Sequence, residues 1–190
     1  MSLTITVMGL VPGNQAIKRS GASVGDDVYV TGYPGEAGAG LQLLGKGDNR
    51  FCSLLNAYQS PQPRIRIGEG LRTIASAAID VSDGLLADLT HILESSAVGA
   101  EINIEKIPLS SEMLEFTTRD KALSLALTAG DDYELCFCAC TSSQDEVDHL
   151  AQSTGVIITR IGGIVKEKGI RLLGDRVDSL DLEQKGYQHF

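Results

Sequence analysis

Residues 78–86 constrain the fold most, because they join a short apolar run to an amphipathic helix through a turn with two carboxylates and a hydroxyl. Asp80 and Ser82 are two positions apart, so an extended backbone directs both side chains to one side. Asp83 stands where a helix N-cap is typical, and Gly84 permits an open turn. The apolar residues that follow recur at helical spacing. They are Leu85, Leu86, Leu89, Ile92 and Leu93.

The acids of this turn fit two interpretations. Carboxylates at a strand end supply the hard oxygen ligands that Mg²⁺ prefers, and a helix start offers N–H donors to a phosphate. The alternative is structural, with the acids capping the helix, because Ser and Asp are among the most common N-cap residues. The local pattern by itself favours the structural alternative.

Composition narrows the class of protein. The 190 residues suit one compact domain, and a hydrophobic fraction of 43% is enough for a core. No apolar run approaches the ~20 residues of a membrane span, and no secretion signal is visible. A net charge of −9 without a basic stripe argues against nucleic acid. We therefore expect a cytoplasmic chain with neither nucleic acid nor membrane as a partner.

Three of the four cysteines, Cys136, Cys138 and Cys140, alternate within residues 133–140. This alternation predicts a strand with the thiols on one face. Zinc ligation would need a His or a second Cys pair at suitable spacing, and neither follows. We expect the thiols to act as small buried hydrophobes in a reducing compartment.

Apolar periodicity predicts the remaining elements. Strands are expected over residues 4–11, 27–31, 101–107 and 133–140, with a terminal hairpin of strands 156–165 and 169–173. Helices are expected around residues 41–44 and over 50–59, 68–76, 114–127 and 144–153. Because strands and helices alternate irregularly, we expect an α/β (α+β) fold in which helices pack on a mixed sheet.

Two further segments have open interpretations. The glycine-rich residues 32–40 either cradle a phosphate or form a small-residue packing face, and their spacing matches neither the dinucleotide nor the Walker pattern. Asp131 and Asp132 follow Gly130, at a helix end, and open the strand that begins at residue 133. They either cap and solvate a turn, or bind a cationic substrate or a metal-held phosphate.

Three motifs, in this order, resemble the thiamine-monophosphate kinase family. They are Ile79-Asp80-Val81-Ser82-Asp83-Gly84-Leu85, Gly130-Asp131-Asp132-Tyr133-Glu134-Leu135, and Lys185-Gly186-Tyr187-Gln188-His189-Phe190. Shorter matches are Arg19-Ser20-Gly21-Ala22, Gly25-Asp26, Tyr29-Val30-Thr31-Gly32 and Pro61-Gln62-Pro63-Arg64. The resemblance runs the full chain. The wider superfamily includes aminoimidazole ribonucleotide synthetase, selenophosphate synthetase and a hydrogenase maturation protein, and the second and third motifs favour the thiamine enzymes within it.

The resemblance implies Mg²⁺-dependent transfer of the γ-phosphoryl group of ATP to thiamine monophosphate, giving thiamine diphosphate. The resemblance implies a protein of two domains that dimerises through its N-terminal domain. The resemblance therefore implies that residues 1–11 are a linker strand from a missing N-terminal domain, and that residues 12–190 are the C-terminal domain that binds ATP and substrate. We expect the full-length protein to be a homodimer and this fragment to be inactive alone.

By the same resemblance, Asp80 and Asp83 are magnesium ligands, and Ser82 and Arg19 contact ATP. The implied substrate contacts are Asp131, Gln184 and Tyr187. Asp131 stands where the family usually has Glu, and Gln184 falls where members place an aromatic residue against the substrate rings. Tyr187 is a nearby candidate for that stacking role. No catalytic nucleophile is expected, since the acceptor phosphate oxygen is already anionic.

Two other functions remain open. One is another ATP-dependent synthetase of the superfamily, acting on selenide or on a purine intermediate. The other is a non-catalytic binding or assembly domain whose acids serve only as caps.

Overall fold

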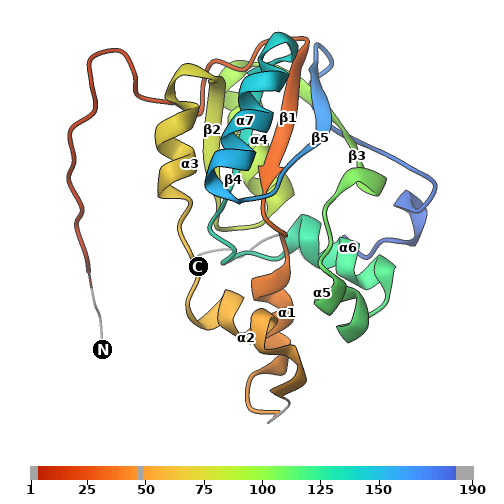
Figure 1. Cartoon of the computed structure of the whole chain (residues 1–190). Helices are drawn as coiled ribbons and strands as arrows, with labels where there is room; N and C mark the ends of the chain where they lie inside the picture. Colours follow the sequence, from red (N-terminus) through yellow and green to blue (C-terminus); the bar gives the residue numbers. More distant parts are fainter. Residues whose placement is uncertain (1–3, 47–48, 183–190) are drawn as a thin grey trace.

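A mixed sheet forms the centre of the molecule in the computed structural model, which describes residues 4–46 and 49–182 (Figure 1). The strands are β1 (Asp26–Thr31), β2 (Ala75–Val81), β3 (Gly99–Asn103), β4 (Glu134–Cys140), β5 (Ile158–Val165) and β6 (Gly169–Leu173). Their order is β2-β4-β1-β5-β3-β6, and all neighbours are antiparallel except β3 and β6. This arrangement confirms the predicted mixed sheet with packed helices.

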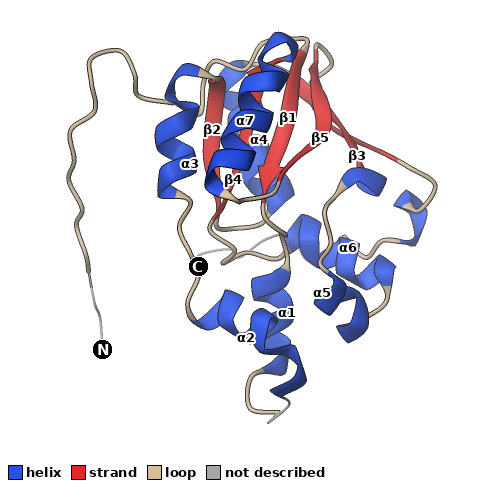
Figure 2. Ribbon diagram, viewed as in Figure 1, coloured by secondary structure: helices blue, strands red, loops and turns tan. Residues whose placement is uncertain are grey.

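Helices cover both faces of this sheet (Figure 2). They are α1 (Glu36–Leu43), α2 (Cys52–Gln59), α3 (Ile65–Gly70), α4 (Leu85–Ser96), α5 (Ser111–Phe116), α6 (Arg119–Thr128) and α7 (Gln144–Thr154). Helices α4 and α6 pack on one face, and α3 and α7 on the other. Helices α1, α2 and α5 gather below the sheet in Figure 1, where they share a smaller core with α6.

Strand alternation divides the core between the two faces. In β4, Cys136 and Cys138 face the α4 side, whereas Phe137 faces the α7 side. The Phe137 ring stacks on Tyr29 of β1, with ring centroids 5.1 Å apart. Complete burial of a large apolar side chain contributes about 1.5–3 kcal/mol, so residues on both faces of β4 anchor it at the centre of the fold.

The prediction of buried thiols is confirmed for two cysteines and wrong for Cys52 and Cys140. Cys136 and Cys138 are buried, and burial raises the pKa of the Cys138 thiol to about 12. Cys140 is exposed because it is the last residue of β4, and Cys52 is exposed as the first residue of α2. Within residues 4–46 and 49–182, no group of three or more His, Cys, Asp or Glu side chains is placed to hold a metal ion. Cys136 and Cys138 pack in the main core on the α4 side of the sheet.

Three helix predictions need new boundaries. The helix expected around 41–44 begins at Glu36 and includes part of the glycine-rich segment. A Cβ at Gly40 would clash with the backbone carbonyl of Leu54, so the small residues let α1 approach α2 closely. The helix expected over 68–76 begins at Ile65 and gives way to β2, and the one expected over 114–127 is divided into α5 and α6. The glycine-rich segment is therefore a packing face.

The terminal strands form, but the predicted hairpin between them is wrong. β5 and β6 both pair with β3, which lies between them. The short connection from Val165 to Gly169 crosses the start of β3 at Gly99. A Cβ at Gly99 would clash with the Glu167 carbonyl, so the missing side chain makes this crossing possible.

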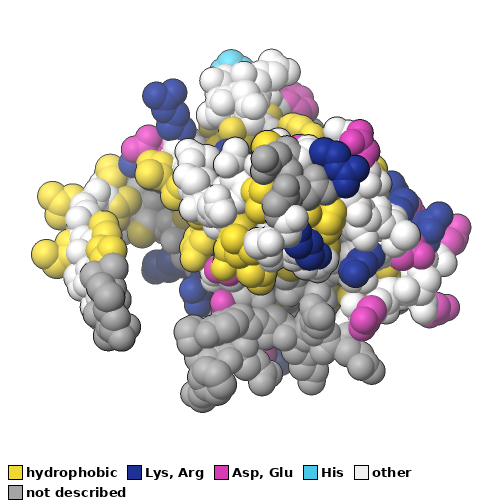
Figure 3. Space-filling model, turned by 90° about the horizontal axis from the view of Figure 1, so that it is seen from below, with side chains coloured by type: hydrophobic (Ala, Val, Ile, Leu, Met, Phe, Trp, Pro, Cys, Tyr) yellow, Lys and Arg dark blue, Asp and Glu magenta, His cyan; other side chains and the backbone are white. Residues whose placement is uncertain are grey.

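The strand expected over residues 4–11 is also absent. This segment extends away from the domain, and Figure 3 shows yellow apolar side chains along it. Ile5, Val7, Met8 and Leu10 are almost fully exposed. A strand needs a partner for its backbone hydrogen bonds, and none lies beside this segment in the described part of the chain. Its assignment as a linker stays a prediction.

No helix among the described residues has both the length and the apolar character needed to cross a membrane.

Candidate active site

Antiparallel pairing of β2 with β4 brings the two acidic motifs of the sequence together. We call residues 80–84 the first acidic turn and residues 130–133 the second acidic turn. Val81 lies opposite Glu134, and the Tyr133 N–H donates to the Val81 carbonyl at 2.9 Å. The Asp131 N–H donates to the Ser82 carbonyl, also at 2.9 Å. Two motifs that are about fifty residues apart in the sequence therefore lie side by side.

Close contact between the turns depends on Gly130. A Cβ at this position would clash with the Ser82 carbonyl and would crowd Cα of Asp83. Both obstacles are backbone atoms, which cannot move aside as the end of a flexible side chain can. Glycine is therefore required here by the space available.

Asp80 and Asp83 keep their carboxylates available. Asp80 is exposed and Asp83 is half-buried. Within residues 4–46 and 49–182, neither carboxylate takes part in a hydrogen bond or an ion pair. Both lie near the buried Asp88, whose pKa is raised first by burial and further by these two negative charges. The first acidic turn thus offers unpartnered oxygen atoms at the surface.

Asp83 is not the N-cap of α4. That position belongs to Gly84, with φ of 119°, and no side chain caps the helix there. The Asp88 carboxylate instead reaches back from the first turn of α4, and its Oδ2 accepts the N–H groups of Ser82 at 2.9 Å and Asp83 at 3.0 Å. The predicted capping role of Asp83 is therefore wrong, and the acid that binds N–H groups at this turn is Asp88.

Two predicted ATP contacts have different settings. Ser82 lies in the first acidic turn and is half-buried. Arg19 is exposed, and its backbone carbonyl accepts the hydroxyl of Ser96 at 3.4 Å, at the opposite end of α4 from Asp83. Arg19 makes no ion pair with another described residue. The structure therefore anchors the Arg19 backbone away from the acidic turns.

Adjacent acids of the second acidic turn differ sharply. Asp131 is exposed, with a left-handed φ of 66°. Asp132 instead accepts the N–H groups of Gly35 at 2.6 Å and Ala37 at 3.0 Å, at the start of α1. Burial raises the pKa of Asp132 to about 7, against the opposing effect of these two hydrogen bonds. Asp132 is thus a structural cap for α1, while Asp131 remains available to a ligand.

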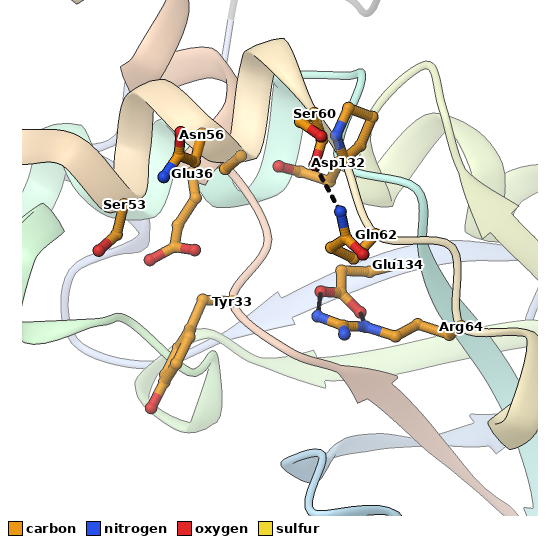
Figure 4. A pocket seen from close by; sticks show the side chains of 11 residues that line it. Tyr33, Glu36, Ser53, Asn56, Ser60, Gln62, Arg64, Asp132 and Glu134 are labelled. Atoms are coloured by element: carbon orange, nitrogen blue, oxygen red, sulfur yellow. Dashed lines mark hydrogen bonds and ion pairs between the residues drawn. The ribbon is translucent and has the colours of Figure 1, made fainter.

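A pocket of about 550 Å³ lies beside the second acidic turn, between α1, α2 and the segment before α3 (Figure 4). Tyr33, Glu36 and Asp132 contribute to its lining, together with the ion pair of Arg64 and Glu134. Asp80, Asp83 and Asp131 are not among its lining residues. The pKa of Glu36 is raised, chiefly by burial. Acidic groups therefore outnumber basic ones in this pocket.

The Arg64–Glu134 pair ties the segment before α3 to the start of β4. Arg64 donates from Nε at 2.7 Å and from Nη2 at 2.5 Å to the two carboxylate oxygens of Glu134. The hydroxyl of Thr31 donates to the same carboxylate at 2.5 Å. Neither this contact nor the role of Asp88 was predicted from the sequence. An acid in the first turn of a helix was a signal for Asp88, but nothing local links residues 64 and 134.

Two predicted substrate contacts, Gln184 and Tyr187, lie outside the described residues.

Comparisons with known proteins assign the family. Residues 23–175 match the family model described as AIR synthase related protein, C-terminal domain. The thiamine-monophosphate kinase of Salmonella typhimurium is 39% identical over 199 residues, which cover 100% of this chain and 60% of that protein. The same enzyme of Haemophilus influenzae is 40% identical over 197 residues, with the same coverage.

Solved structures agree with this assignment. The crystal structure of thiamine-monophosphate kinase from Stenotrophomonas maltophilia has a TM-score of 0.81 at 40% identity, covering 86% of this chain and 55% of that one. A structure described as AaThiL complexed with AMPPCP and TMP has a TM-score of 0.76 at 31% identity, covering 92% and 54%. The chain spans about 60% of the length of the curated relatives it matches. It belongs to the family of AIR synthase related proteins, of which it forms the C-terminal domain, and its curated relatives there are thiamine-monophosphate kinases.

Proposed function

We propose that this chain is the C-terminal part of a thiamine-monophosphate kinase, which transfers the γ-phosphoryl group of ATP to thiamine monophosphate. One observation carries the proposal. The pairing of β2 with β4 places Asp80 and Asp83, the proposed magnesium ligands, beside Asp131, the proposed substrate contact. None of the three carboxylates takes part in a hydrogen bond within the described residues.

The donor set of the first acidic turn fits Mg²⁺. Asp80 and Asp83 provide hard oxygen atoms without competing partners, and Mg²⁺ is usually bound through one or two carboxylates together with substrate phosphates and waters. The ion would neutralise phosphate charge when bound. Two carboxylates do not complete a site for several ions, so the remaining ligands would come from the substrates, from water and from the N-terminal part of the protein.

The chain's own residues would bind and orient the two anions rather than attack them. Phosphoryl transfer depends chiefly on positioning and charge neutralisation, and the acceptor oxygen is already negative. Ser82 would contact ATP from the first acidic turn, and Arg19 would contact it from the other end of α4. Asp131 would face the positive thiazolium or the aminopyrimidine of the substrate.

The test uses the full-length protein with Asp80→Asn and Asp83→Asn. Each variant should lose roughly 100-fold or more in kcat, because charge stabilisation of the transferred group is lost, while Tm changes by only a few degrees. Glu94→Gln is the matched control, since Glu94 is an exposed acid near the other end of α4. Full activity in both aspartate variants would contradict the metal assignment.

A substrate panel separates the proposal from its alternatives. ADP release should require thiamine monophosphate, and selenide or a purine intermediate should give none. Productive reaction with either of those would identify another synthetase of the superfamily. Nucleotide binding without any turnover by the full-length protein would favour a binding domain.

The split site makes a further prediction about this chain. Residues 1–190 alone should show little or no turnover, because too few metal ligands are present, and co-expression with the N-terminal part should restore it. Full activity of the isolated chain would contradict this part of the proposal. We also propose that the full-length protein is a homodimer, which its sedimentation would check, and that it is cytoplasmic, which cell fractionation would check.

A further inference from the structure

The buried carboxylate of Asp88 lies directly beneath the first acidic turn. We propose that Asp88 is a positioning residue: it fixes the backbone of Ser82 and Asp83, and so sets the direction of the side chains that bind ATP and magnesium. This inference rests on the proposed function, because it assigns a role within the same site.

Geometry supports this role. Asp88 is 2% exposed, and a single oxygen, Oδ2, accepts both turn N–H groups at 2.9 and 3.0 Å. Leu85 and Leu89, on either side of Asp88 in α4, are fully buried in the main core. The two hydrogen bonds therefore connect a firmly packed helix to the turn that carries the proposed ligands.

Neither capping of α4 nor the negative charge of Asp88 accounts for its role. The α4 N-cap is Gly84, and no side chain caps the helix at that position. A buried carboxylate near Asp80 and Asp83 adds like-charge repulsion and a desolvation cost, which a neutral acceptor would avoid. Asp88 is also not a direct ligand through Oδ2, because both turn N–H groups already occupy that oxygen. What it supplies is a fixed turn.

Two matched substitutions in the full-length protein separate geometry from charge. Asp88→Asn keeps an oxygen at the same reach and loses the negative charge. Asp88→Glu keeps the charge and moves the oxygen by about one bond. Asp145→Ala is the control, because Asp145 is an exposed acid in the first turn of α7. Thiamine monophosphate phosphorylation is measured against Mg²⁺ concentration, and amide hydrogen exchange is measured over residues 81–86.

Asp88→Glu should raise the Mg²⁺ concentration for half-maximal rate roughly 10-fold or more, as losses of supporting contacts around metal ligands do. It should also speed exchange at the Ser82 and Asp83 amides. Asp88→Asn should stay within about 3-fold of wild type in Mg²⁺ dependence, less than the loss typical of a removed support. The control should change neither measurement.

Three results would overturn the inference. They are an Asn variant affected as strongly as the Glu variant, unchanged exchange in the Glu variant, or faster exchange without a change in Mg²⁺ dependence. If the wild-type protein does not phosphorylate thiamine monophosphate, the proposed function fails by itself. The same variants are then compared by Mg²⁺-dependent ATP binding, and an unshifted Glu variant in that measurement overturns the role of Asp88.

Discussion

The two acidic turns solve the same structural problem in opposite ways. The first acidic turn is held from its own helix, because Asp88 reaches back to the N–H groups of Ser82 and Asp83. The second acidic turn is held from outside, because its own Asp132 reaches across to the start of α1. At each turn one carboxylate binds backbone N–H groups, Asp88 from α4 at the first and Asp132 from within the second, and at least one carboxylate of the turn is left without a hydrogen bond among the described residues.

This difference shows how to separate structural acids from candidate ligands. Asp131 and Asp132 are adjacent, yet one is exposed and the other caps a distant helix. The partner of a carboxylate, rather than its place in a motif, indicates its role. Four predictions test this comparison, from the largest expected effect on stability to the smallest.

Contact between the turns should be broken by Gly130→Ala. The added methyl group would meet the Ser82 carbonyl, so one turn has to move. We expect a loss of about 3 kcal/mol in the free energy of unfolding, near the upper end for an overpacked site. Urea denaturation of the chain measures this value.

Gly68→Ala provides the control for that substitution. A Cβ at Gly68 in α3 would meet only the end of the Leu135 side chain, at an ordinary distance of 4.0 Å. We expect the free energy of unfolding to rise by up to about 1 kcal/mol, because alanine favours a helix more than glycine does. A Gly130→Ala variant as stable as Gly68→Ala would mean that the turns are not in tight contact.

Arg64→Ala should weaken the contact between the segment before α3 and the start of β4, directly after the second acidic turn. This change leaves the Glu134 carboxylate with the Thr31 hydroxyl as its remaining partner. Glu134 is the first residue of β4 and is 7% exposed. We expect the free energy of unfolding to fall by about 2 kcal/mol. This is less than for breaking a fully buried ion pair, because the Arg64 side chain is 26% exposed. Thermal unfolding measures the change. Arg66→Ala, at an exposed neighbour, should stay within about 0.5 kcal/mol of wild type.

Asp132→Asn should change the pH dependence of stability. The folded-state pKa of Asp132, about 7, is above the ordinary value of 3.8. The folded protein therefore holds this proton more tightly than the unfolded chain. That stabilisation is full below pH 4 and is lost as pH rises through about 7.

Asparagine has no proton to lose. The free energy of unfolding of the variant should therefore rise relative to that of the wild type by roughly 1–3 kcal/mol between pH 4 and pH 8. Urea denaturation across this range gives the difference, with Glu94→Gln as a control for loss of an exposed acid. A difference between variant and wild type that does not change with pH would mean that Asp132 is not held in a buried setting.

Much of the fold could be predicted because its signals are local. The strand and helix around the first acidic turn, the alternation of β4 and the helical spacing of α7 each lie within a few residues. The position of β6 could not be predicted, since it depends on Gly99 allowing a connection to cross the start of β3. The unpaired state of residues 4–11 likewise depends on which strand edges are available.

The site divides in the same way. Motif resemblance selected Asp80, Asp83 and Asp131, whose carboxylates are left without hydrogen bonds in the described chain. The contacts that hold these residues in place were missed. They involve Asp88 and the bond between residues 64 and 134, whose partners are identified only once the chain is folded.

The smallest effect on stability is expected for Asp131→Asn. Asp131 is exposed, and asparagine tolerates its left-handed φ of 66° as well as aspartate does, so the free energy of unfolding should stay within about 0.5 kcal/mol of wild type. In the full-length protein, however, the KM for thiamine monophosphate should rise roughly 10-fold, the loss expected for one contact to a charged group. Steady-state kinetics with Asp131→Glu shows whether a longer carboxylate preserves the contact. A stability loss as large as that of Gly130→Ala, with KM unchanged, would show that an unpartnered acid in this turn is structural after all.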